Sequence, residues 1–286
     1  MHFTKLQATG NDFILLETAD EARDWPPLAT AMCHRHFGIG SDGLLLLMPS
    51  RRADFRMRMF NPDGSEAEAC GNGLRCVVRY IIDKERVKSG APEMMIETAA
   101  GLRPVRLRRQ GKAVNKIQVG MGTPRFRAEA IPVALESAAG EVVDITPMLG
   151  YTATVAGREL KLNLVSMGNP HAVYYGPGPV ADFPITELGP LVEHLAVFPE
   201  RTNFEVVRVL SRREVEARVW ERGAGETLSC GSGACALAVA GQQLGLLDNS
   251  VAVRLPGGTL EVQWDRVGEV FLSGPAETVF TGEWPD

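Results

Sequence analysis

EAEACGNG at residues 66–73 and ETLSCGSG at residues 226–233 are two copies of one motif. Each copy places a glutamate four positions before a cysteine, and each cysteine begins a Cys-Gly-polar-Gly turn. A segment rich in Ala, Val and Leu follows each turn, at 74–82 and at 234–247, and its composition predicts a helix. The motif therefore predicts two cysteines, Cys70 and Cys230, each on a glycine-rich turn at the start of a helix.

The expected position of these cysteines favours thiolate chemistry. The first N–H groups of a helix have no partner within the helix, and they stabilise a negative sulfur together with the positive end of the helix dipole. The same N–H groups bind anions such as a carboxylate. One cysteine before a helix is more often a buried apolar residue than a nucleophile, but two in matching motifs reverse that expectation. We therefore expect two thiols that face one substrate.

Composition limits the class of protein. The chain has 286 residues, enough for two domains, and it is 45% hydrophobic and 23% charged, which argues against disorder. A net charge of −5 with both signs interspersed argues against a nucleic-acid partner, and no apolar run is long enough for a membrane span. Five cysteines without an export signal indicate reduced thiols and a cytoplasmic location.

The repeat extends beyond the cysteine motifs. Four landmarks recur in one order at nearly one offset, which indicates two homologous halves. They are Gly10-Asn11 with Gly168-Asn169 (offset 158), Asp42 with Asn203 (161), Asn61 with Glu221 (160) and Cys70 with Cys230 (160). The sequence therefore predicts an α+β fold of two pseudo-symmetric halves, with the active site in the cleft between them.

Local patterns predict individual elements. Alternating or apolar runs predict strands at 13–16, 44–48, 54–60 and 213–220, longer segments predict helices at 25–36 and 182–194, and 120–124 is a plausible linker. Three short strands are expected between 94 and 121, where Arg106 and Arg108 alternate with apolar residues. This group of basic residues, which includes Lys112, therefore indicates a solvated strand face rather than a nucleic-acid patch.

Inversion of a carbon centre requires a base on one face and an acid on the other, and a twofold-related pair of thiols supplies both. The α-proton of an amino acid is very weakly acidic, so the carboxylate must be stabilised as negative charge builds on it. The expected donors are the amides of Gly71, Asn72, Gly231 and Ser232. Neither half has a phosphate loop paired with an isolated lysine, so no pyridoxal phosphate site is expected.

Several other residues have two possible roles. His171 follows Gly168-Asn169-Pro170 and is either a satisfied turn histidine or a functional one. The adjacent Glu221 and Arg222 are either a surface pair or the groups that hold an ammonium and a carboxylate of one amino acid. The remaining cysteines lack the short spacing of zinc ligands, so no metal site is expected and they are predicted to be core thiols. They are Cys33, Cys76 and Cys235.

At these residues the sequence resembles the diaminopimelate epimerase family. The resemblance follows the whole chain in order, and the two long cysteine motifs are highly specific. The matching segments are TGNDF at 9–13, GIGSD at 38–42, FNPDGSE at 60–66, CGNGLRC at 70–76, GNPH at 168–171, ERGAGET at 221–227 and CGSGAC at 230–235. One position departs from part of the family: Gly43 stands where Gln is often found.

The resemblance implies a cofactor-independent epimerase that interconverts LL- and meso-2,6-diaminopimelate in the synthesis of lysine and peptidoglycan precursors. It implies that Cys70 and Cys230 are the base and acid pair, and that His171 and Glu221 poise them. The substrate would be held, mainly at its distal end, by Asn11, Asn61, Asn169, Asn203, Glu221 and Arg222. The family fold implies two mostly antiparallel sheets, each curled around a central helix, with halves at 1–122 plus 276–286 and at 123–275. A homodimer is possible.

Two alternatives have weaker support. Another two-cysteine racemase, acting on histidine or proline, would leave the distal-end residues unpaired. A non-catalytic amino acid-binding protein of this fold would have no need for both cysteines.

Overall fold

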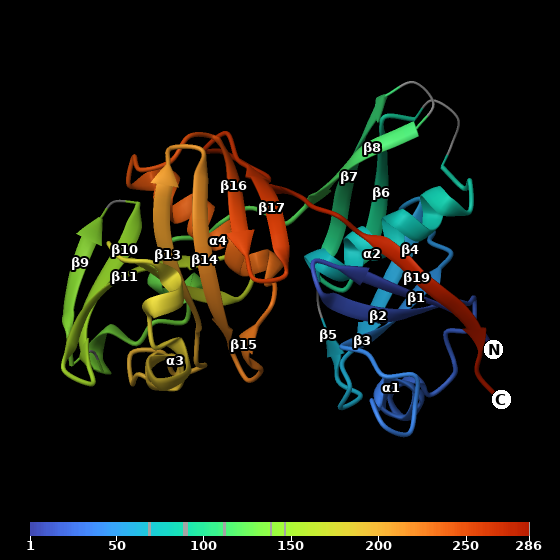
Figure 1. Cartoon of the computed structure of the whole chain (residues 1–286), viewed down its shortest axis with the longest axis horizontal. Helices are drawn as coiled ribbons and strands as arrows, with labels where there is room; N and C mark the ends of the chain where they lie inside the picture. The colour runs from blue at the N-terminus through green and yellow to red at the C-terminus, as the bar shows by residue number, and fades with distance from the viewer. Residues whose placement is uncertain (68–69, 88–90, 111–112, 138, 146, 286) are drawn as a thin grey trace. The chain divides into compact units, whose positions relative to one another are not determined.

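Two α+β units make up the chain, as the repeated motif predicts. A computed structural model describes residues 1–67, 70–87, 91–110, 113–137, 139–145 and 147–285 (Figure 1). Contacts between Cα atoms divide the chain into unit 1, Met1–Gly120 with Ser273–Asp286, and unit 2, Met121–Leu272. The sequence predicts divisions after residues 122 and 275. Lys112, from the expected basic strand face, lies outside the described residues.

Unit 1 is a mixed sheet curled around one helix. Its strands pair in the order β19-β1-β2-β3-β4-β6-β7-β8, with β5 beside β4, and β2–β3 and β4–β6 are parallel pairs. The strands are β1 His2–Ala8, β2 Asn11–Glu17, β3 Gly43–Met48, β4 Phe55–Phe60, β5 Glu66–Ala67, β6 Glu93–Thr98, β7 Gly101–Gln110, β8 Ala113–Gly120 and β19 Glu277–Glu283. The helix α2, Gly71–Asp83, packs against β1, β8 and β19, while α1, Trp25–Cys33, packs against β3.

Unit 2 repeats this architecture. Its strands pair in the order β9-β10-β11-β12-β13-β14-β16-β17, with β15 beside β14, and β12–β13 and β14–β16 are the parallel pairs. The strands are β9 Glu141–Ile145, β10 Met148–Val155, β11 Arg158–Ser166, β12 Pro170–Tyr175, β13 Asn203–Ser211, β14 Glu214–Glu221, β15 Gly225–Thr227, β16 Ser250–Leu255 and β17 Gly258–Gln263. A further short strand, β18 Phe271–Ser273, crosses the boundary between the two units in sequence. The helix α4, Gly231–Gln243, packs against β11, β12, β13 and β17, while α3, Ile185–Glu193, packs against β13 and β14.

The sheet register refines the alignment of the two halves. In β2–β3, Phe13 pairs with Gly43, and in β12–β13, His171 pairs with Asn203. The counterpart of Asn203 is therefore Gly43, at an offset of 160, and not Asp42 as the sequence comparison suggests. A motif comparison cannot separate neighbouring residues in a loop, whereas the hydrogen-bond register of a sheet does.

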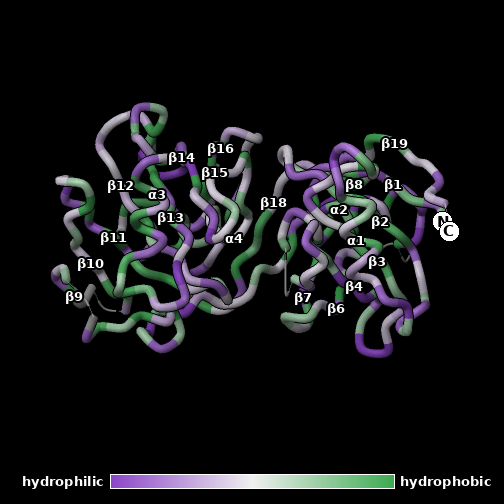
Figure 2. The backbone as a smooth tube through the Cα atoms, turned by 90° about the horizontal axis from the view of Figure 1, so that it is seen from below, coloured by the Kyte–Doolittle hydropathy of each residue, from purple (hydrophilic) through white to green (hydrophobic). Residues whose placement is uncertain are grey.

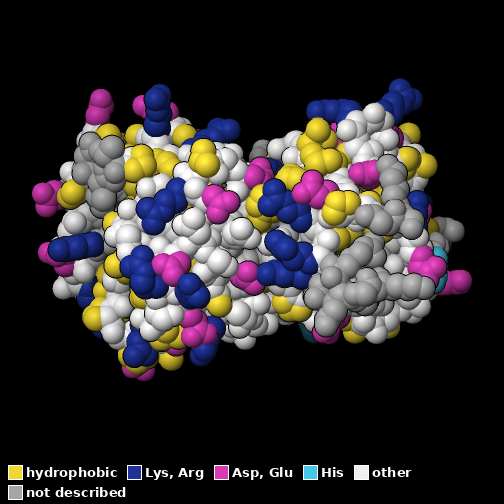
Figure 3. Space-filling view, turned by 90° about the horizontal axis from the view of Figure 1, so that it is seen from above, with side chains coloured by type: hydrophobic (Ala, Val, Ile, Leu, Met, Phe, Trp, Pro, Cys, Tyr) yellow, Lys and Arg dark blue, Asp and Glu magenta, His cyan; other side chains and the backbone are white. Residues whose placement is uncertain are grey.

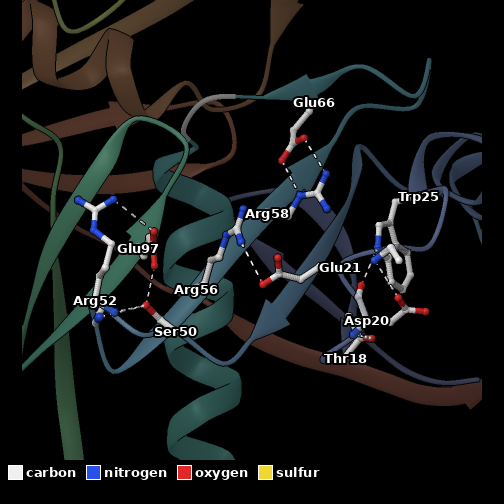
Figure 4. A network of polar contacts seen from close by, with 12 residues as sticks. Thr18, Asp20, Glu21, Trp25, Ser50, Arg52, Arg56, Arg58, Glu66 and Glu97 are labelled. Atoms are coloured by element: carbon white, nitrogen blue, oxygen red, sulfur yellow. Dashed lines mark hydrogen bonds and ion pairs between the residues drawn. The ribbon is translucent and has the colours of Figure 1, made fainter.

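The glutamate of each cysteine motif has the same structural role in both units. Arg58 contacts Glu66 through two hydrogen bonds of 2.7 and 2.8 Å (Figure 4), and Arg218 contacts Glu226 through two of 2.6 and 2.9 Å. Each two-pronged pair joins the strand before the cysteine turn to its neighbour, β5 to β4 or β15 to β14. Such pairs fix geometry as well as adding energy, so they set the path of the chain into each cysteine.

The predicted elements agree with the structure except at some helix ends. The alternation predicted for β14 is confirmed, because Val215, Ala217 and Val219 are buried. The first helix ends at Cys33 rather than at 36, since His34 has extended backbone angles and its Nδ1 accepts the backbone N–H groups of His36 and Phe37. The helix predicted to extend to 247 ends at Gln243, two residues before Gly245, whose φ of 72° is left-handed.

The surface agrees with the expected charge pattern. Basic and acidic side chains are interspersed on the face drawn in Figure 3. Apolar and polar residues alternate along the backbone in both units (Figure 2). Arg106 and Arg108 are exposed, while Val105 and Leu107 between and before them are buried, which confirms a solvated strand face. Among the helices in the described part of the chain, none has the length and apolar composition needed to cross a membrane.

The two Arg–Glu pairs offer a matched test of stability. Arg218 also donates hydrogen bonds to the carbonyl oxygens of Val180 and Phe183, at 3.0 and 2.9 Å, whereas Arg58 stacks over the ring of Phe60. Replacing Arg218 removes these hydrogen bonds together with the ion pair to Glu226, and leaves the two carbonyls only their backbone donors, the N–H groups of Phe183 and Ile185. We therefore expect Arg218→Ala to lower the free energy of unfolding by roughly 2–3 kcal/mol and Arg58→Ala by roughly 1 kcal/mol. Urea unfolding measures both values; equal losses would contradict this role of Arg218.

Candidate functional site

Both motif cysteines cap the central helix of their unit. Cys70 precedes α2 and Cys230 precedes α4, each with extended backbone angles. The sulfur of each accepts the N–H of the glycine three residues later, Gly73 or Gly233, at 3.3 Å. The prediction that each cysteine begins a helix is confirmed, and each sulfur occupies one of the donors that a helix start leaves unpaired.

In unit 1, the side chains of Asn11 and Asn72 lie together beside the Cys70 turn. Asn72 donates to the Oδ1 of Asn11 at 3.2 Å, and its own Oδ1 accepts from Arg75 at 2.7 Å. Arg75 is fully buried and also donates to the carbonyl of Gly71 at 3.3 Å. Arg75 thus holds the first turn of α2 from beneath, and two of the predicted substrate-binding residues are in direct contact.

A group of ionic contacts supports Asn11 from the other side. The amide of Asn11 donates to Asp42 at 2.7 Å, and Arg35 contacts Asp42 at 2.6 Å and Asp12 at 2.8 Å. Burial opposes ionisation of Asp12, but hydrogen bonds from Arg35 and Lys5 outweigh it and lower the pKa of this carboxyl group. The Asp12 carboxylate therefore stays charged and pairs with Arg35, while Asp42 holds the amide of Asn11 in place.

Asn61 lies in the turn after β4. Its backbone N–H donates to the carbonyl of Ser65 at 2.8 Å, and its amide donates to the Ser65 hydroxyl at 2.9 Å. The structure thus shows Asn61 organising its own turn. Its predicted contact with substrate stays a prediction.

In unit 2, a continuous series of polar contacts leads from the Cys230 sulfur into the core. The hydroxyl of Ser232 lies 3.5 Å from the sulfur and 3.3 Å from the Nδ2 of Asn169. The Oδ1 of Asn169 lies 3.0 Å from the Nε2 of His171, and the Nδ1 of His171 lies 2.6 Å from the Oε1 of Glu205. His171 lies on strand β12 rather than in a turn. It is connected to Cys230 through Asn169 and Ser232.

The ionisation of Cys230 differs from the expectation for a helix start. Burial raises the pKa of the Cys230 thiol well above its usual value, and the charge of Glu221 raises it further. The hydroxyl of Ser232 and the N–H of Gly233 act in the opposite direction but do not outweigh burial. A helix start favours a thiolate, yet the residue is only 4% exposed and its sulfur loses the solvation of its charge. Cys230 is therefore a thiol at neutral pH in this structure.

Asn203 joins two parts of unit 2 by its amide group. It donates to the carbonyl of Pro170 at 2.7 Å and accepts the backbone N–H of Arg222 at 2.9 Å. The side chain of Arg222 donates to the carbonyl of Glu200 at 3.1 Å, and the carboxylate of Glu221 accepts from a threonine hydroxyl at 2.5 Å. Glu221 and Arg222 therefore use separate partners, while Asn203 holds the chain at Arg222 near the residue before His171.

Sequence reasoning missed two buried charged residues near the cysteines. Glu205 has no exposed surface and lies in a strand between Phe204 and Val206, and Arg75 has none and lies in α2 between Leu74 and Cys76. A charged residue inside an apolar run was the available signal in both cases, because such residues are rarely buried without a partner. Both belong to the polar groups that support the cysteine turns.

The other cysteines are core residues, as predicted: Cys33, Cys76 and Cys235 are at most 2% exposed. Burial raises the pKa of the Cys76 thiol, which makes it a poor nucleophile. Within the described ranges, no group of three His, Cys, Asp or Glu side chains lies close enough to hold a metal ion.

The ionisation of Cys230 predicts its reactivity. Because the thiolate is the nucleophile, its alkylation by iodoacetamide should be slow at pH 7 and should keep rising, about tenfold per pH unit, beyond the ordinary thiol pKa of about 8.5. Peptide mass spectrometry measures the rate at this residue, with glutathione as the reagent control. A rate that levels off below pH 8 would contradict a raised pKa.

Comparison with known proteins agrees with this geometry. A profile of the family described as diaminopimelate epimerase matches residues 3–127 and 163–279. A diaminopimelate epimerase of Moorella thermoacetica is 45% identical over 288 residues, covering 100% of this chain and 99% of the relative. A diaminopimelate epimerase of Pelotomaculum thermopropionicum is 46% identical over 291 residues, with the same coverage.

Two solved structures share the fold. A probable proline racemase from Agrobacterium radiobacter has a TM-score of 0.68 at 15% identity and covers 99% of this chain and 92% of its own. A phenazine biosynthesis protein of the PhzF family from Bacillus anthracis has a TM-score of 0.66 at 16% identity and covers 100% and 99%. At these identities the likeness concerns the fold alone. The full-length relatives and the family profile show that the chain belongs to the diaminopimelate epimerase family.

Proposed function

We propose that the chain interconverts LL- and meso-2,6-diaminopimelate by a two-base mechanism without a cofactor. The observation that carries this proposal is the matched pair of helix-capping cysteines, one in each unit, in a chain of this family. The two units present the same turn on the same scaffold. A pair of equivalent thiols can serve opposite faces of one α-carbon, which a single site cannot do.

The reaction is a transfer of one proton off the α-carbon and another proton onto it. The thiolate of one cysteine removes the α-proton, and the thiol of the other delivers its proton to the opposite face. Negative charge builds on the substrate carboxylate, where backbone amides of Gly71, Asn72, Gly231 and Ser232 can stabilise it. Burial keeps Cys230 protonated in the free protein, so Cys230 is the proton donor in the direction in which Cys70 is the base.

Recognition of the distal end rests on the family motif. We assign the distal carboxylate to the guanidinium of Arg222 and the distal ammonium to Glu221. Asn203 supports this assignment because it fixes the backbone of Arg222. Asn11, Asn61 and Asn169 complete the proposed substrate contacts, and His171 and Glu221 are proposed to poise the cysteines.

The same proposal extends to the biological setting. Products of this reaction are precursors of lysine and peptidoglycan, and we place the protein in the cytoplasm as a possible homodimer. The cysteines in the described part of the chain are free thiols, and all but the half-buried Cys70 are buried, which is compatible with a reducing compartment.

A single assay tests the reaction class. Purified protein is incubated with LL-diaminopimelate in deuterated water without added cofactor, and the product is examined by mass spectrometry and proton NMR. Epimerisation should give meso product with deuterium at one α-carbon. Parallel reactions with L-histidine and L-proline test a racemase of different specificity. Exchange with either of these and none with diaminopimelate would overturn the proposed substrate, and no exchange at all would favour a binding protein.

The two-base mechanism predicts that neither thiol is dispensable. Cys70→Ala and Cys230→Ala should each abolish epimerisation, and the corresponding Ser variants should retain only a trace, because a hydroxyl is a far weaker acid than a thiol and is scarcely ionised at neutral pH. Cys235→Ala, in the helix that Cys230 caps, is the matched control and should keep most of the activity. Wild-type rates in either Ala variant of the motif cysteines would refute the mechanism.

The distal-end assignment predicts a loss of specificity at Arg222. Truncating one partner of a buried charged hydrogen bond costs roughly 2–5 kcal/mol, so kcat/KM for diaminopimelate should fall by about 30-fold or more in Arg222→Ala. Arg222→Lys should rescue only in part because lysine lacks the planar fork.

Arg212→Ala, at an exposed position, serves as the control for loss of a surface arginine. Circular dichroism confirms that each variant is folded. A folded Arg222→Ala variant with near wild-type kcat/KM would show that Arg222 does not anchor the distal end.

A further inference from the structure

The residues that pack beneath the two cysteine turns are different. A Cβ atom placed on Gly73 would lie 3.0 Å from a methyl carbon of Leu45, and one placed on Gly233 would lie 3.0 Å from the Oε1 of Glu205. Leu45 in β3 and Glu205 in β13 are 160 positions apart, the offset of the cysteines, and both side chains are fully buried. The same place beneath the first helical turn therefore holds a methyl group in unit 1 and a carboxyl group in unit 2.

The neighbouring strand differs in the same way. Phe13 pairs with Gly43 in unit 1, and His171 pairs with Asn203 in unit 2, so Phe13 and His171 are counterparts. Unit 1 thus has an apolar pair, Phe13 and Leu45, where unit 2 has an imidazole and a carboxyl group. The repeat preserves the backbone, but the chemistry beneath the two thiols is unequal.

We propose that Glu205 is a positioning residue for Cys230: by holding the ring of His171, it fixes Asn169 and Ser232 so that the Ser232 hydroxyl stays on the Cys230 sulfur. The consequence for catalysis rests on the proposed epimerase function, whereas the effect on the thiol does not. Ser232, Asn169 and His171 stand between Cys230 and Glu205 in this series, so Glu205 does not contact the substrate. It acts by fixing the orientation of the groups between them.

The hydrogen-bond donors and acceptors of this series determine which atoms carry protons. The Nδ2 of Asn169 faces Ser232, so its Oδ1, which can only accept, faces the Nε2 of His171, and that nitrogen must carry a proton. A second proton lies between the Nδ1 of His171 and Glu205, 2.6 Å apart. Whichever of the two atoms holds it, the pair is neutral overall. Burial also raises the pKa of Glu205, which helps the pair to retain this proton.

A purely structural role explains Glu205 poorly. Its second oxygen, Oε2, is buried with no hydrogen-bond partner among the residues that the structure describes, so the contact with His171 is the one that holds the carboxyl group. A buried polar atom without a partner is destabilising, and the leucine found at the same place in unit 1 has no such atom. The carboxyl group therefore has a use that outweighs this cost.

Other titratable groups face this region from three strands. Glu221, at the end of β14, faces Cys230, while His171 and Tyr175, both on β12, face Glu205 on β13. The hydroxyl of Tyr175 donates to the carbonyl of Leu237, and burial raises its pKa, so it stays neutral and bound elsewhere. Replacing Glu205 leaves the contacts of Glu221 and Tyr175 in place, but it removes the charge of Glu205, which itself raises the pKa of Cys230 by less than the Ser232 hydroxyl lowers it. Glu205→Gln also removes this charge while keeping a bond to His171, so the difference between the glutamine and leucine variants reports the link through His171.

Three variants distinguish a positioning role of Glu205 from a role in packing alone. Glu205→Gln keeps a side chain that can bond to His171, and Glu205→Leu introduces the residue of unit 1. The double variant His171→Phe with Glu205→Leu copies the apolar pair of unit 1, which already packs beneath a turn of the same geometry. Leu45→Met, beneath the other cysteine, is the matched control and should leave the Cys230 profile unchanged.

The readout is the pH–rate profile for alkylation of Cys230 by iodoacetamide, compared with that of Cys70 in the same sample. In Glu205→Leu and in the double variant, loss of the fixed hydroxyl should shift the Cys230 profile upward by about one pH unit, a roughly tenfold lower rate at a given pH. The Cys70 profile should not move, and Glu205→Gln should stay within about threefold of the unmodified protein. In the epimerase assay, kcat should fall about tenfold in Glu205→Leu, while KM changes little.

Two results would overturn the proposal: an unmoved Cys230 profile in the folded leucine or double variant, or an equal shift in Glu205→Gln. If Glu205→Leu fails to fold, the profile of the double variant decides between these outcomes. Failure of the proposed function has a different signature. In that case the unmodified protein does not turn over diaminopimelate, while the alkylation profiles still report whether Glu205 positions Cys230.

Discussion

Each unit depends on one short contact, from the N–H of a glycine in the first turn of the central helix to the sulfur of the cysteine that caps it. A helix that starts inside a curled sheet must satisfy its first N–H groups without water. The sulfur does this and so becomes part of the scaffold. Glycine suits this position because a Cβ at Gly73 or Gly233 would lie 3.0 Å from the side chain beneath, which would have to shift. The cysteine of each unit is therefore both the helix cap and the reactive group.

Around this contact the two units share the same backbone architecture but differ in the buried side chains. Both units keep the two-pronged Arg–Glu pair, the parallel pair of strands under the turn and the helix packed against the sheet. Beneath the turns, however, Leu45 is matched by Glu205, and the buried Arg75 is matched by Cys235 at the same offset. Backbone hydrogen bonds tolerate such changes, because they depend little on the side chain, and so two like turns come to hold unlike thiols.

The sequence predicts the features that depend on neighbours along the chain. Two helix starts, the alternating strand β14 and the buried Cys76 all follow from local patterns. Features that join distant residues were not predictable. His171 and Glu205 are 34 positions apart, and only the register of β12 and β13 brings them to 2.6 Å. The ionisation of Cys230 is a second case, because the helix start is visible in the sequence while the burial that outweighs it depends on packing.

The strand β19 lies beside β1, and the terminal ammonium of Met1 donates to the carbonyl of Trp284, so unit 1 is built from both ends of the chain. Unit 2, in contrast, is one continuous segment. During synthesis from the N-terminus, all of unit 2 emerges before β19 exists. Until then β1 exposes its edge, and α2 lacks one of the strands against which it packs. The order of translation thus favours completion of the Cys230 half first, and the Cys70 half closes only with the last strand.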